Sequence, residues 1–373
     1  MSVSYGGDSI TFADGSVQSG AWNGFRNRII NGCGIIDQRN AGASYSVPTT
    51  NPAYSVDRWA VYATNASKYT VQQSTEAPAG YPGSIKFTSS AATTVNSTDY
   101  YCFRQTIEGY NIADLNLGTV NAKTCTLSFW VRSSVTGVFG AAAGEGTGKW
   151  YPFTYTINTA DTWEYKTIVI TGDTNNLGTY SKTNGTGMFI QWQLGIGSTY
   201  IGGSSTWTAS TYLAGAGTNS SGIIATNGAT FYITGVQLER GSTASSFEYR
   251  PYGTELALCQ RYFEKTYLQS EVPGANYDAR DSACRTYSFG DSSAQSQPFV
   301  WNFKVSKRIA PTLNIYNPYN GTANQYRVVE TGTNMSAQVI KNTSTETCTV
   351  ASSGAGLSSN YRFDVHLTAA SEL

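Results

Sequence analysis

An alternation of apolar and polar residues with a period of two is the feature that most constrains how this chain can fold. The segment 125–132 (CTLSFWVR) carries an apolar side chain at every second position, and 188–196 (MFIQWQLGI) repeats the pattern. This spacing sends successive side chains to opposite faces of a β-strand. Further strands are expected at 163–170 and 231–238. Because loops rich in glycine, serine and threonine join these strands, we expect a β-sandwich of the jelly-roll type.

One of these strands breaks the alternation. Phe231 and Ile233 fall out of phase with Val236 and Leu238. A β-bulge adds one residue to a strand and so changes the phase of the side chains that follow it. A bulge at Gly235 would therefore return all four apolar side chains to one face.

Composition supports an all-β fold and argues against several classes of protein. Charged residues make up only 13% of the 373 residues, about half the usual share, so Glu and Lys are too scarce for a helical bundle. The 24 basic and 24 acidic residues cancel and form no basic cluster, which argues against nucleic-acid binding. No apolar stretch of about 18 residues is present, so no membrane insertion is expected. The first residues lack a secretory signal, which predicts folding in a cytoplasm.

The six cysteines are scattered along the chain and include no CxxC pair. This spacing fits neither a structural zinc site nor a disulfide framework. We interpret the cysteines as small buried hydrophobic residues.

Four parts follow one another along the chain. Residues 1–25 read as an extended N-terminal arm, and residues 26–250 as the central jelly-roll sandwich. Residues 251–266 read as a short linking helix, and residues 267–373 as a smaller C-terminal β-sandwich. No repeat of fixed period is present.

The arm is expected to contain a hairpin that is too small to be stable alone. Strands at 10–12 and 17–18 flank turn residues at 13–16. Such a hairpin is marginally stable in water. We therefore expect the arm to dock on a partner through Ile10, Phe12 and Val17.

The linking helix carries apolar residues at helical spacing. Thr254 is the expected N-cap, and Leu256, Cys259 and Phe263 lie on one stripe. The stripe either packs within the chain or meets two other copies around the axis of a trimer. The residues alone leave both alternatives open.

Four groups of segments follow one another along the chain: 10–18 (ITFADGSVQ); 26–32 (RNRIING) with 36–40 (IDQRN) and 57–59 (DRW); 235–241 (GVQLERG) with 247–251 (FEYRP); and 255–262 (ELALCQRY). In this order they resemble a family of tailed-phage tail fibre and virion structural proteins, whose middle region is similar to a carbohydrate-binding-module jelly roll. The resemblance extends from the arm to the helix and fades in the last third of the chain.

This resemblance implies a homotrimeric fibre or appendage of a virion, made in the cytoplasm of the host bacterium. The arm would attach it to other virion proteins. The resemblance implies no catalytic site. Jelly rolls of this kind often hold a structural calcium near Asp37 and Glu239, but no loop with regular acidic spacing is present. We therefore expect neither a metal nor a cofactor.

The residue types needed for catalysis are sparse. His366 is the single histidine, and no nucleophile-elbow motif accompanies it, so we expect it to have a structural role. Glycoside cleavage needs two carboxylates, which makes a capsule depolymerase the enzymatic alternative. The candidate acids are Glu264, Glu271, Asp278 and Asp281.

Two groups of residues are candidates for binding a glycan or another receptor. Aromatic rings stack on the apolar faces of sugars, while amides and guanidinium groups bind hydroxyls. The central group is the outward set Trp130, Arg132, Gln191 and Gln193. We favour the alternative that a neighbouring subunit or loop covers these residues.

The distal group lies in a turn rich in tyrosine, a residue that makes effective contact surfaces. Tyr316, Asn317 and Tyr319 belong to the turn, and Tyr326 lies nearby in the sequence. Packing of the turn itself, or a contact between subunits of a trimer, is the alternative that we favour.

The sequence therefore predicts an all-β, non-enzymatic tail fibre or appendage protein. It would attach to a host surface glycan or protein through many weak contacts. A purely architectural virion protein, such as a head decoration or a tail adaptor, is the alternative.

Overall fold

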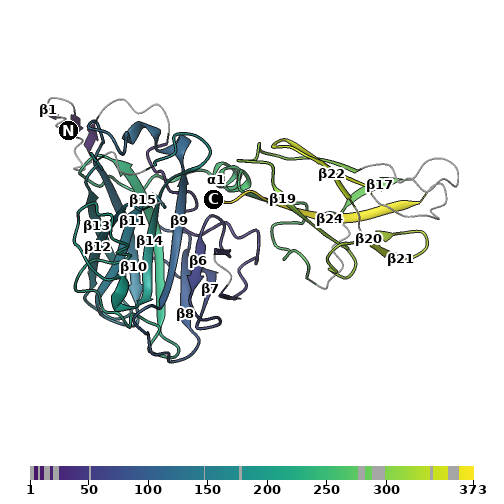
Figure 1. Cartoon of the computed structure of the whole chain (residues 1–373). Coiled ribbons are helices and arrows are strands. Elements are labelled where there is room, and N and C mark those ends of the chain that lie inside the picture. The colour runs from purple at the N-terminus through teal and green to yellow at the C-terminus, as the bar shows by residue number, and fades with distance from the viewer. Residues whose placement is uncertain are drawn as a thin grey trace. The chain divides into compact units, whose positions relative to one another are not determined.

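The computed structural model describes the chain except for residues 1–3, 7–8, 12–16, 20–24, 50–51, 147, 176–178, 276–281, 288–298, 337–338 and 352–360. Two compact units are present (Figure 1). Unit 1 comprises Met1–Ile35, Ser44–Arg250 and Leu373, and unit 2 comprises Ile36–Ala43 and Pro251–Glu372.

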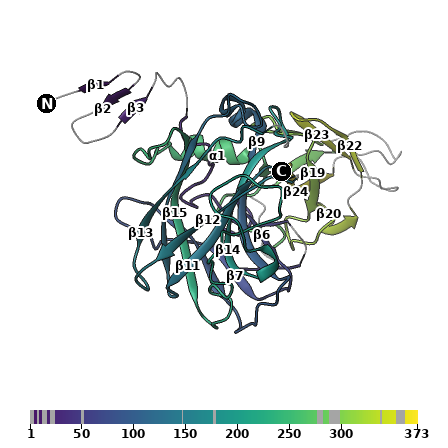
Figure 2. The same ribbon diagram turned by 60° about the vertical axis from the view of Figure 1, so that its left-hand side comes forward.

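Unit 1 is built around an antiparallel β-sandwich of two six-stranded sheets, as the alternation predicted (Figure 2). Sheet I contains, in order, β13 (Glu164–Ile170), β10 (Cys125–Ser133), β15 (Thr230–Arg240), β8 (Ser84–Ser89), β7 (Tyr69–Ser74) and β4 (Tyr45–Ser46). Sheet II contains β12 (Trp150–Ile157), β11 (Gly137–Gly144), β14 (Thr186–Ile196), β9 (Tyr100–Glu108), β6 (Ala60–Ala63) and β5 (Ala53–Tyr54). Short 3-10 helices lie at η1 (Gly109–Asn111), η2 (Ala113–Leu115) and η3 (Ser198–Tyr200).

The core of unit 1 lies between these sheets. The apolar positions of the two alternating segments are fully buried, which confirms the predicted inward faces of β10 and β14. They are Leu127, Phe129, Val131, Ile190, Trp192 and Leu194. Burying each such large side chain contributes about 1.5–3 kcal/mol to stability. The rings of Phe103 and Trp192 stack nearly parallel at 5.3 Å.

Strand β15 contains the bulge predicted at Gly235. The pairing register shifts between Ser128 and Trp130 of β10, so Gly235 and Val236 both lie opposite Phe129. Gly235 has a φ of 59°, a left-handed conformation that favours glycine. The four apolar side chains that were expected to share a face are fully buried: Phe231, Ile233, Val236 and Leu238.

The arm forms a three-stranded antiparallel sheet. Its strands are β1 (Ser4–Gly6), β2 (Ser9–Thr11) and β3 (Val17–Ser19), in that order. The pairing of β2 with β3 agrees with the predicted hairpin, and β1 is a strand that the pattern did not indicate. Ile10 lies on β2 and Val17 on β3, whereas Phe12 lies outside the described residues.

Unit 2 contains two further sheets and one α-helix, α1 (Tyr252–Gln260). In the first sheet, β24 (Arg362–Ala370) pairs with β16 (Phe263–Lys265), β17 (Cys284–Tyr287), β19 (Thr312–Tyr316) and β20 (Gln325–Val328), and β21 (Thr333–Ser336) pairs with β20. The second contains β18 (Phe299–Asn302), β23 (Thr347–Ala351) and β22 (Val339–Thr343). Their shared core includes Leu313, Ile315, Phe363 and Leu367.

Helix α1 is shorter than the sequence pattern predicted. Its N-cap is Pro251 and not Thr254. The amides of Thr254 and Glu255 already donate to the Pro251 carbonyl, at 2.9 and 3.1 Å, so the helix begins before Thr254. The helix ends at Gln260, and Phe263 belongs to β16, where it pairs with Ala370 of β24.

The predicted apolar stripe is therefore not one helical face. Cys259 and Phe263 are both buried within unit 2, while Leu256 is half-buried. Packing within the chain accounts for Cys259 and Phe263, so these two side chains are not available for contact with another copy. Five of the six cysteines are buried.

In the described part of the chain, no helix is long and apolar enough to cross a membrane.

Candidate functional site: an aromatic face on sheet I

Five aromatic side chains lie next to one another on the outer side of sheet I. Trp130 of β10 and Tyr165 of β13 are cross-strand neighbours whose ring centroids lie 5.4 Å apart. Tyr81 lies 6.3 Å from Trp130, and its hydroxyl accepts a hydrogen bond of 3.2 Å from Trp130 Nε1. Phe247 and Tyr249 lie 5.5 and 5.8 Å from Tyr81. We call these five residues the aromatic face.

The bulge in β15 creates the space that two of these rings occupy. A Cβ atom on Gly235 would lie 2.6 Å from the Tyr81 ring and 3.3 Å from Trp130. Tyr249 is fixed from the other side, because its hydroxyl donates to the Gly80 carbonyl at 2.8 Å. Burial raises the pKa of Tyr81 to about 12, so its hydroxyl stays neutral at physiological pH.

The aromatic face is open to solvent along part of its length. Tyr165 is 44% exposed and Tyr249 is 57% exposed, while Tyr81, Trp130 and Phe247 are half-buried. Contiguous exposed apolar rings on a soluble protein mark interaction sites more often than isolated ones do. Their mutual packing fixes their orientation before any ligand arrives.

A row of polar side chains crosses the same outer surface beside the aromatic face. Arg132, Tyr232, Lys86 and Gln72 are successive cross-strand neighbours on β10, β15, β8 and β7. The Arg132 guanidinium lies 5.3 Å and the Lys86 ammonium 5.5 Å from the centroid of the Tyr232 ring. Since Arg132 follows Trp130 by two positions along β10, the two rows are about 7 Å apart.

The guanidinium of Arg132 is held in place by two acidic residues. Its Nη1 atom pairs with the carboxylate of Glu76, and its Nε donates to the Asp161 carbonyl at 2.9 Å. Its Nη2 lies 3.6 Å from Asp161 Oδ1. The edge of the site therefore offers both hydrogen-bond donors and acceptors.

The structure does not bring the predicted central group together. Trp130 and Arg132 lie on the outer side of sheet I, but Gln191 and Gln193 lie on β14 of sheet II, 1% and 2% exposed. Gln193 donates to the carbonyl of Leu213 at 2.9 Å. A loop of the same chain thus covers Gln193, in line with the alternative that the sequence favoured.

The distal group is mostly interior. Asn317 and Tyr326 are buried, so neither can contact a receptor, and Tyr316 and Tyr319 are half-buried. The Asn317 side chain accepts a hydrogen bond from the backbone of Tyr319 at 2.9 Å, and the Tyr316 ring packs against Tyr267. Packing of the turn accounts for Tyr316, Asn317 and Tyr319, and packing in the core of unit 2 accounts for Tyr326.

His366 has the contacts of a structural residue. It is fully buried, and its Nδ1 lies 2.8 Å from the Thr266 hydroxyl. Its ring stacks on Tyr267 with centroids 3.7 Å apart.

Two of the acids considered for glycoside cleavage have structural partners. Glu264 is fully buried in an ion pair with Lys307. Glu271 accepts hydrogen bonds within its own loop, from Leu268 N at 2.9 Å. Asp278 and Asp281 lie outside the described residues.

The carboxylates considered for calcium accept hydrogen bonds from residues close to them in the sequence. Asp37 accepts from the amides of Asn40 and Gly42 at 2.9 and 2.8 Å. Glu239 accepts from Ser245 N and Oγ at 2.8 and 2.7 Å. Within the described ranges, no three His, Cys, Asp or Glu side chains form a group that could hold a metal.

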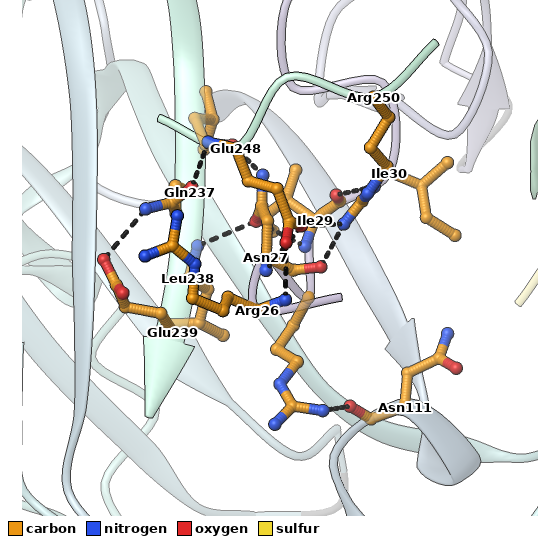
Figure 3. Close-up of polar contacts among 12 residues, drawn as sticks. Arg26, Asn27, Ile29, Ile30, Asn111, Gln237, Leu238, Glu239, Glu248 and Arg250 are labelled. Atoms are coloured by element: carbon orange, nitrogen blue, oxygen red, sulfur yellow. Dashed lines mark hydrogen bonds and ion pairs between the residues drawn. The ribbon is translucent and has the colours of Figure 1, made fainter. Parts of the chain in front are cut away.

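Segments that carry the sequence resemblance meet in a polar clasp (Figure 3). The Glu248 carboxylate accepts from the backbone amides of Arg26 and Asn27 at 2.8 and 3.1 Å. Arg250 donates to the carbonyl of Ile29 at 3.1 Å and to that of Asn27. The segment that precedes the strands of the sandwich is thus hydrogen-bonded to the segment that follows them.

The same clasp reaches β15. Asn27 donates from Nδ2 to the Val236 carbonyl at 3.0 Å and accepts at Oδ1 from Leu238 N at 3.1 Å. Gln237 Oε1 accepts from Glu248 N at 2.8 Å. The clasp thus provides hydrogen-bond partners for backbone groups of β15 and of the segment that precedes the sandwich.

The segment 247–250 links the clasp to the aromatic face. Its side chains alternate, so that Glu248 and Arg250 enter the clasp while Phe247 and Tyr249 pack on Tyr81. Sequence reasoning missed this contribution, although the period of two in FEYR was a signal for it. It also missed Tyr165, because cross-strand pairing with Trp130 depends on register.

No protein-family model and no curated protein matches this chain. Among solved structures, this chain is similar to the enzymatically active domain of bacteriophage CBA120 tailspike protein 4. The two share 14% identity with a TM-score of 0.33, and the match covers 58% of this chain and 21% of that chain. A putative sugar binding protein from Bacteroides thetaiotaomicron matches with 14% identity, 58% and 100% coverage and a TM-score of 0.34. A family 11 carbohydrate-binding module from Clostridium thermocellum matches with 9% identity, 55% and 98% coverage and a TM-score of 0.28. The chain therefore spans about a fifth of the tailspike chain, and these TM-scores assign neither a family nor a ligand.

Proposed function

We propose that this chain is a tail fibre or appendage protein that attaches a phage virion to a host surface glycan through the aromatic face. The observation that carries the proposal is the row of open, mutually packed rings beside a row of polar side chains. A sugar has apolar ring faces and a rim of hydroxyls, so stacking and hydrogen bonding are needed together. The sequence resemblance to phage virion proteins supports the proposed place of this chain in a virion.

The proposed mechanism is attachment without catalysis. Single sites of this kind bind weakly, and several linked copies raise the apparent affinity by a factor of about 10²–10⁴. A homotrimer would supply three aromatic faces. The arm would dock on other virion proteins, since β1 and β3 are the edges of a small sheet and edges pair readily with added strands.

The proposal is tested with purified full-length protein on a panel of immobilised bacterial surface polysaccharides. We expect the double variant Trp130→Ala, Tyr165→Ala to lose at least about ten-fold in affinity, since two stacked rings contribute about 1–3 kcal/mol. Tyr110→Ala is the matched control, because Tyr110 is 62% exposed on η1 and lies outside the aromatic face.

Three results would contradict the proposal. Equal binding by the double variant would exclude the aromatic face as the site. Binding to no polysaccharide, with the chain located on the capsid of an imaged particle, would favour an architectural role. Release of new reducing ends from a bound polysaccharide would indicate a depolymerase.

A further inference from the structure

We infer that the outer side of sheet II carries a second site, centred on Arg104, that binds the carboxylate of an acidic saccharide. Arg104 lies on β9 and is half-buried. Its guanidinium carbon lies 3.9 Å from the centroid of the Phe189 ring and 4.7 Å from that of Tyr62. Contacts with these two rings hold the planar cation in place.

A buried amide fixes the direction of this guanidinium. Both Nε and Nη2 of Arg104 donate to Oε1 of Gln191, the first at 2.9 Å. Gln191 is the cross-strand neighbour of Arg104 and is only 1% exposed. A guanidinium has five N–H donors. The bonds to Gln191 use two of them, the Tyr62 hydroxyl also interacts with the guanidinium, and the remaining N–H groups are left for other acceptors.

Two observations indicate that a negatively charged acceptor belongs here. Over the described residues, no carboxylate forms an ion pair with Arg104, whereas Arg28, Arg132 and Arg250 each pair with one. The buried Nε2 atom of Gln191 also has no hydrogen-bond partner in this part of the chain. A buried donor without an acceptor costs about 1–3 kcal/mol, so the described residues around Arg104 leave one polar group unsatisfied.

The surroundings favour a saccharide as the bearer of this charge. A carboxylate matches the forked geometry of a guanidinium. Tyr62 is a half-buried aromatic residue whose ring lies 4.7 Å from the Arg104 guanidinium carbon. Trp150, on the edge strand β12, packs 5.2 Å from Phe189. Such rings provide apolar surface for a sugar ring.

A loop determines which part of sheet II stays open. It packs on β11 at Gly140, where an added Cβ would lie 2.4 Å from the Cβ of Ala214, and it is anchored to Gln193 through Leu213. Gln193 is therefore covered, while Arg104 on the neighbouring strand is only half-buried.

The inference is tested by titrating the full chain with glucuronate, galacturonate and N-acetylneuraminate, and with neutral glucose and galactose, while backbone and side-chain NMR signals are recorded. At least one acidic sugar should bind ten-fold or more tightly than the neutral sugars. The variant Arg104→Gln should lose at least ten-fold in that affinity. Lys182→Gln, which removes an exposed lysine, should lose none.

A second variant keeps the test valid if Arg104→Gln fails to fold. Gln191→Glu would place a carboxylate against Arg104 at nearly constant volume, so it should remain folded and lose binding of the acidic sugar. No binding of any acidic sugar, or unchanged binding in a folded Arg104→Gln or Gln191→Glu variant, would overturn the inference.

This site is independent of the aromatic face. The double variant Trp130→Ala, Tyr165→Ala should keep its affinity for the acidic sugar, so a failure at one site is distinguishable from a failure at the other. Loss of acidic-sugar binding in that variant would overturn the assignment to sheet II.

Discussion

At the residue scale, the side chains of 247–250 perform two tasks in alternation. Glu248 and Arg250 close the sandwich through backbone groups of the segment that enters it. Phe247 and Tyr249 pack on Tyr81 and extend the aromatic face. The clasp therefore positions part of the candidate site, and damage to it should affect both stability and binding.

Arg250→Met should lower the free energy of unfolding of unit 1 by about 3–5 kcal/mol, because it leaves Glu248 and two carbonyls without their buried partner. The Arg250 side chain is only 3% exposed. Asp114→Asn is the control: it breaks an ion pair whose acid is 41% exposed and should cost less than about 1 kcal/mol. Equal losses in the two variants, measured by denaturant unfolding, would contradict this account.

Single residues also show where prediction from sequence succeeds and fails. The alternation identified Trp130 and Arg132 correctly as outward residues of one strand. It also assigned Gln191 and Gln193 to an outward face, yet both are buried. A period of two tells which side of a sheet a residue faces, but what covers that side depends on distant loops.

At the element scale, the bulge in β15 contributes both to the core and to the candidate site. The sequence predicted it because the apolar phase changes at one glycine. Its consequence for Tyr81 and Trp130, whose rings lie over Gly235, could be seen only in the structure. The end of α1 could not be predicted, since Phe263 continues the helical spacing but pairs with β24 instead.

Gly235→Ala should destabilise unit 1 by about 1–2 kcal/mol from the left-handed backbone alone, and more from the contact with Tyr81. It should also weaken glycan binding by displacing two rings. Gly253→Ala is the control, because an added Cβ there meets nothing within 4 Å. Unchanged stability and binding in Gly235→Ala, measured by thermal unfolding and polysaccharide affinity, would refute the role given to the bulge.

The connection between β12 and β13 should depend on pH. Burial acts to raise the pKa of Glu164, but hydrogen bonds from Lys166, Thr159 and Asn158 outweigh it and lower the pKa to about 2. Since the folded value lies below the ordinary value of 4.5, the stability that this carboxylate contributes is present above pH 4.5 and is lost as pH falls towards 2.

Fluorescence of the neighbouring Trp163 should report this loss between pH 4.5 and 2. The variant Glu164→Gln should remove that part of the pH dependence and leave the rest. A signal with the same pH dependence in both proteins would show that other carboxyls are responsible.

At the scale of the whole molecule, the two units are not simple consecutive stretches of sequence. Residues 36–43 belong to unit 2 although they lie far from the rest of it in the chain. Gln38 donates to the Phe263 carbonyl at 2.7 Å, and Arg39 lies 3.8 Å over the Phe263 ring and pairs with Glu372 at 3.0 Å. The segment IDQRN was noticed only as part of a resemblance, because such long-range packing has no local signal.

A fragment of residues 251–373 should therefore unfold at a lower temperature than unit 2 does within the full chain. Adding a peptide of residues 34–45 should raise its melting temperature in a concentration-dependent way. The same peptide with Gln38→Ala and Arg39→Ala is the control and should have little effect. A fragment already as stable as unit 2 in the full chain would contradict the assignment.

The central claim is that the aromatic face binds a glycan. The most direct measurement is the indole N–H signal of Trp130 in ¹⁵N-labelled protein, followed during titration with an oligosaccharide from a polysaccharide that the protein binds. Trp130 donates this group to Tyr81 within the aromatic face, whereas Trp59 and Trp192 are buried in the core. We expect the Trp130 signal to shift and saturate while the signals of Trp59 and Trp192 stay in place. Saturable binding that leaves the Trp130 signal unchanged would contradict it.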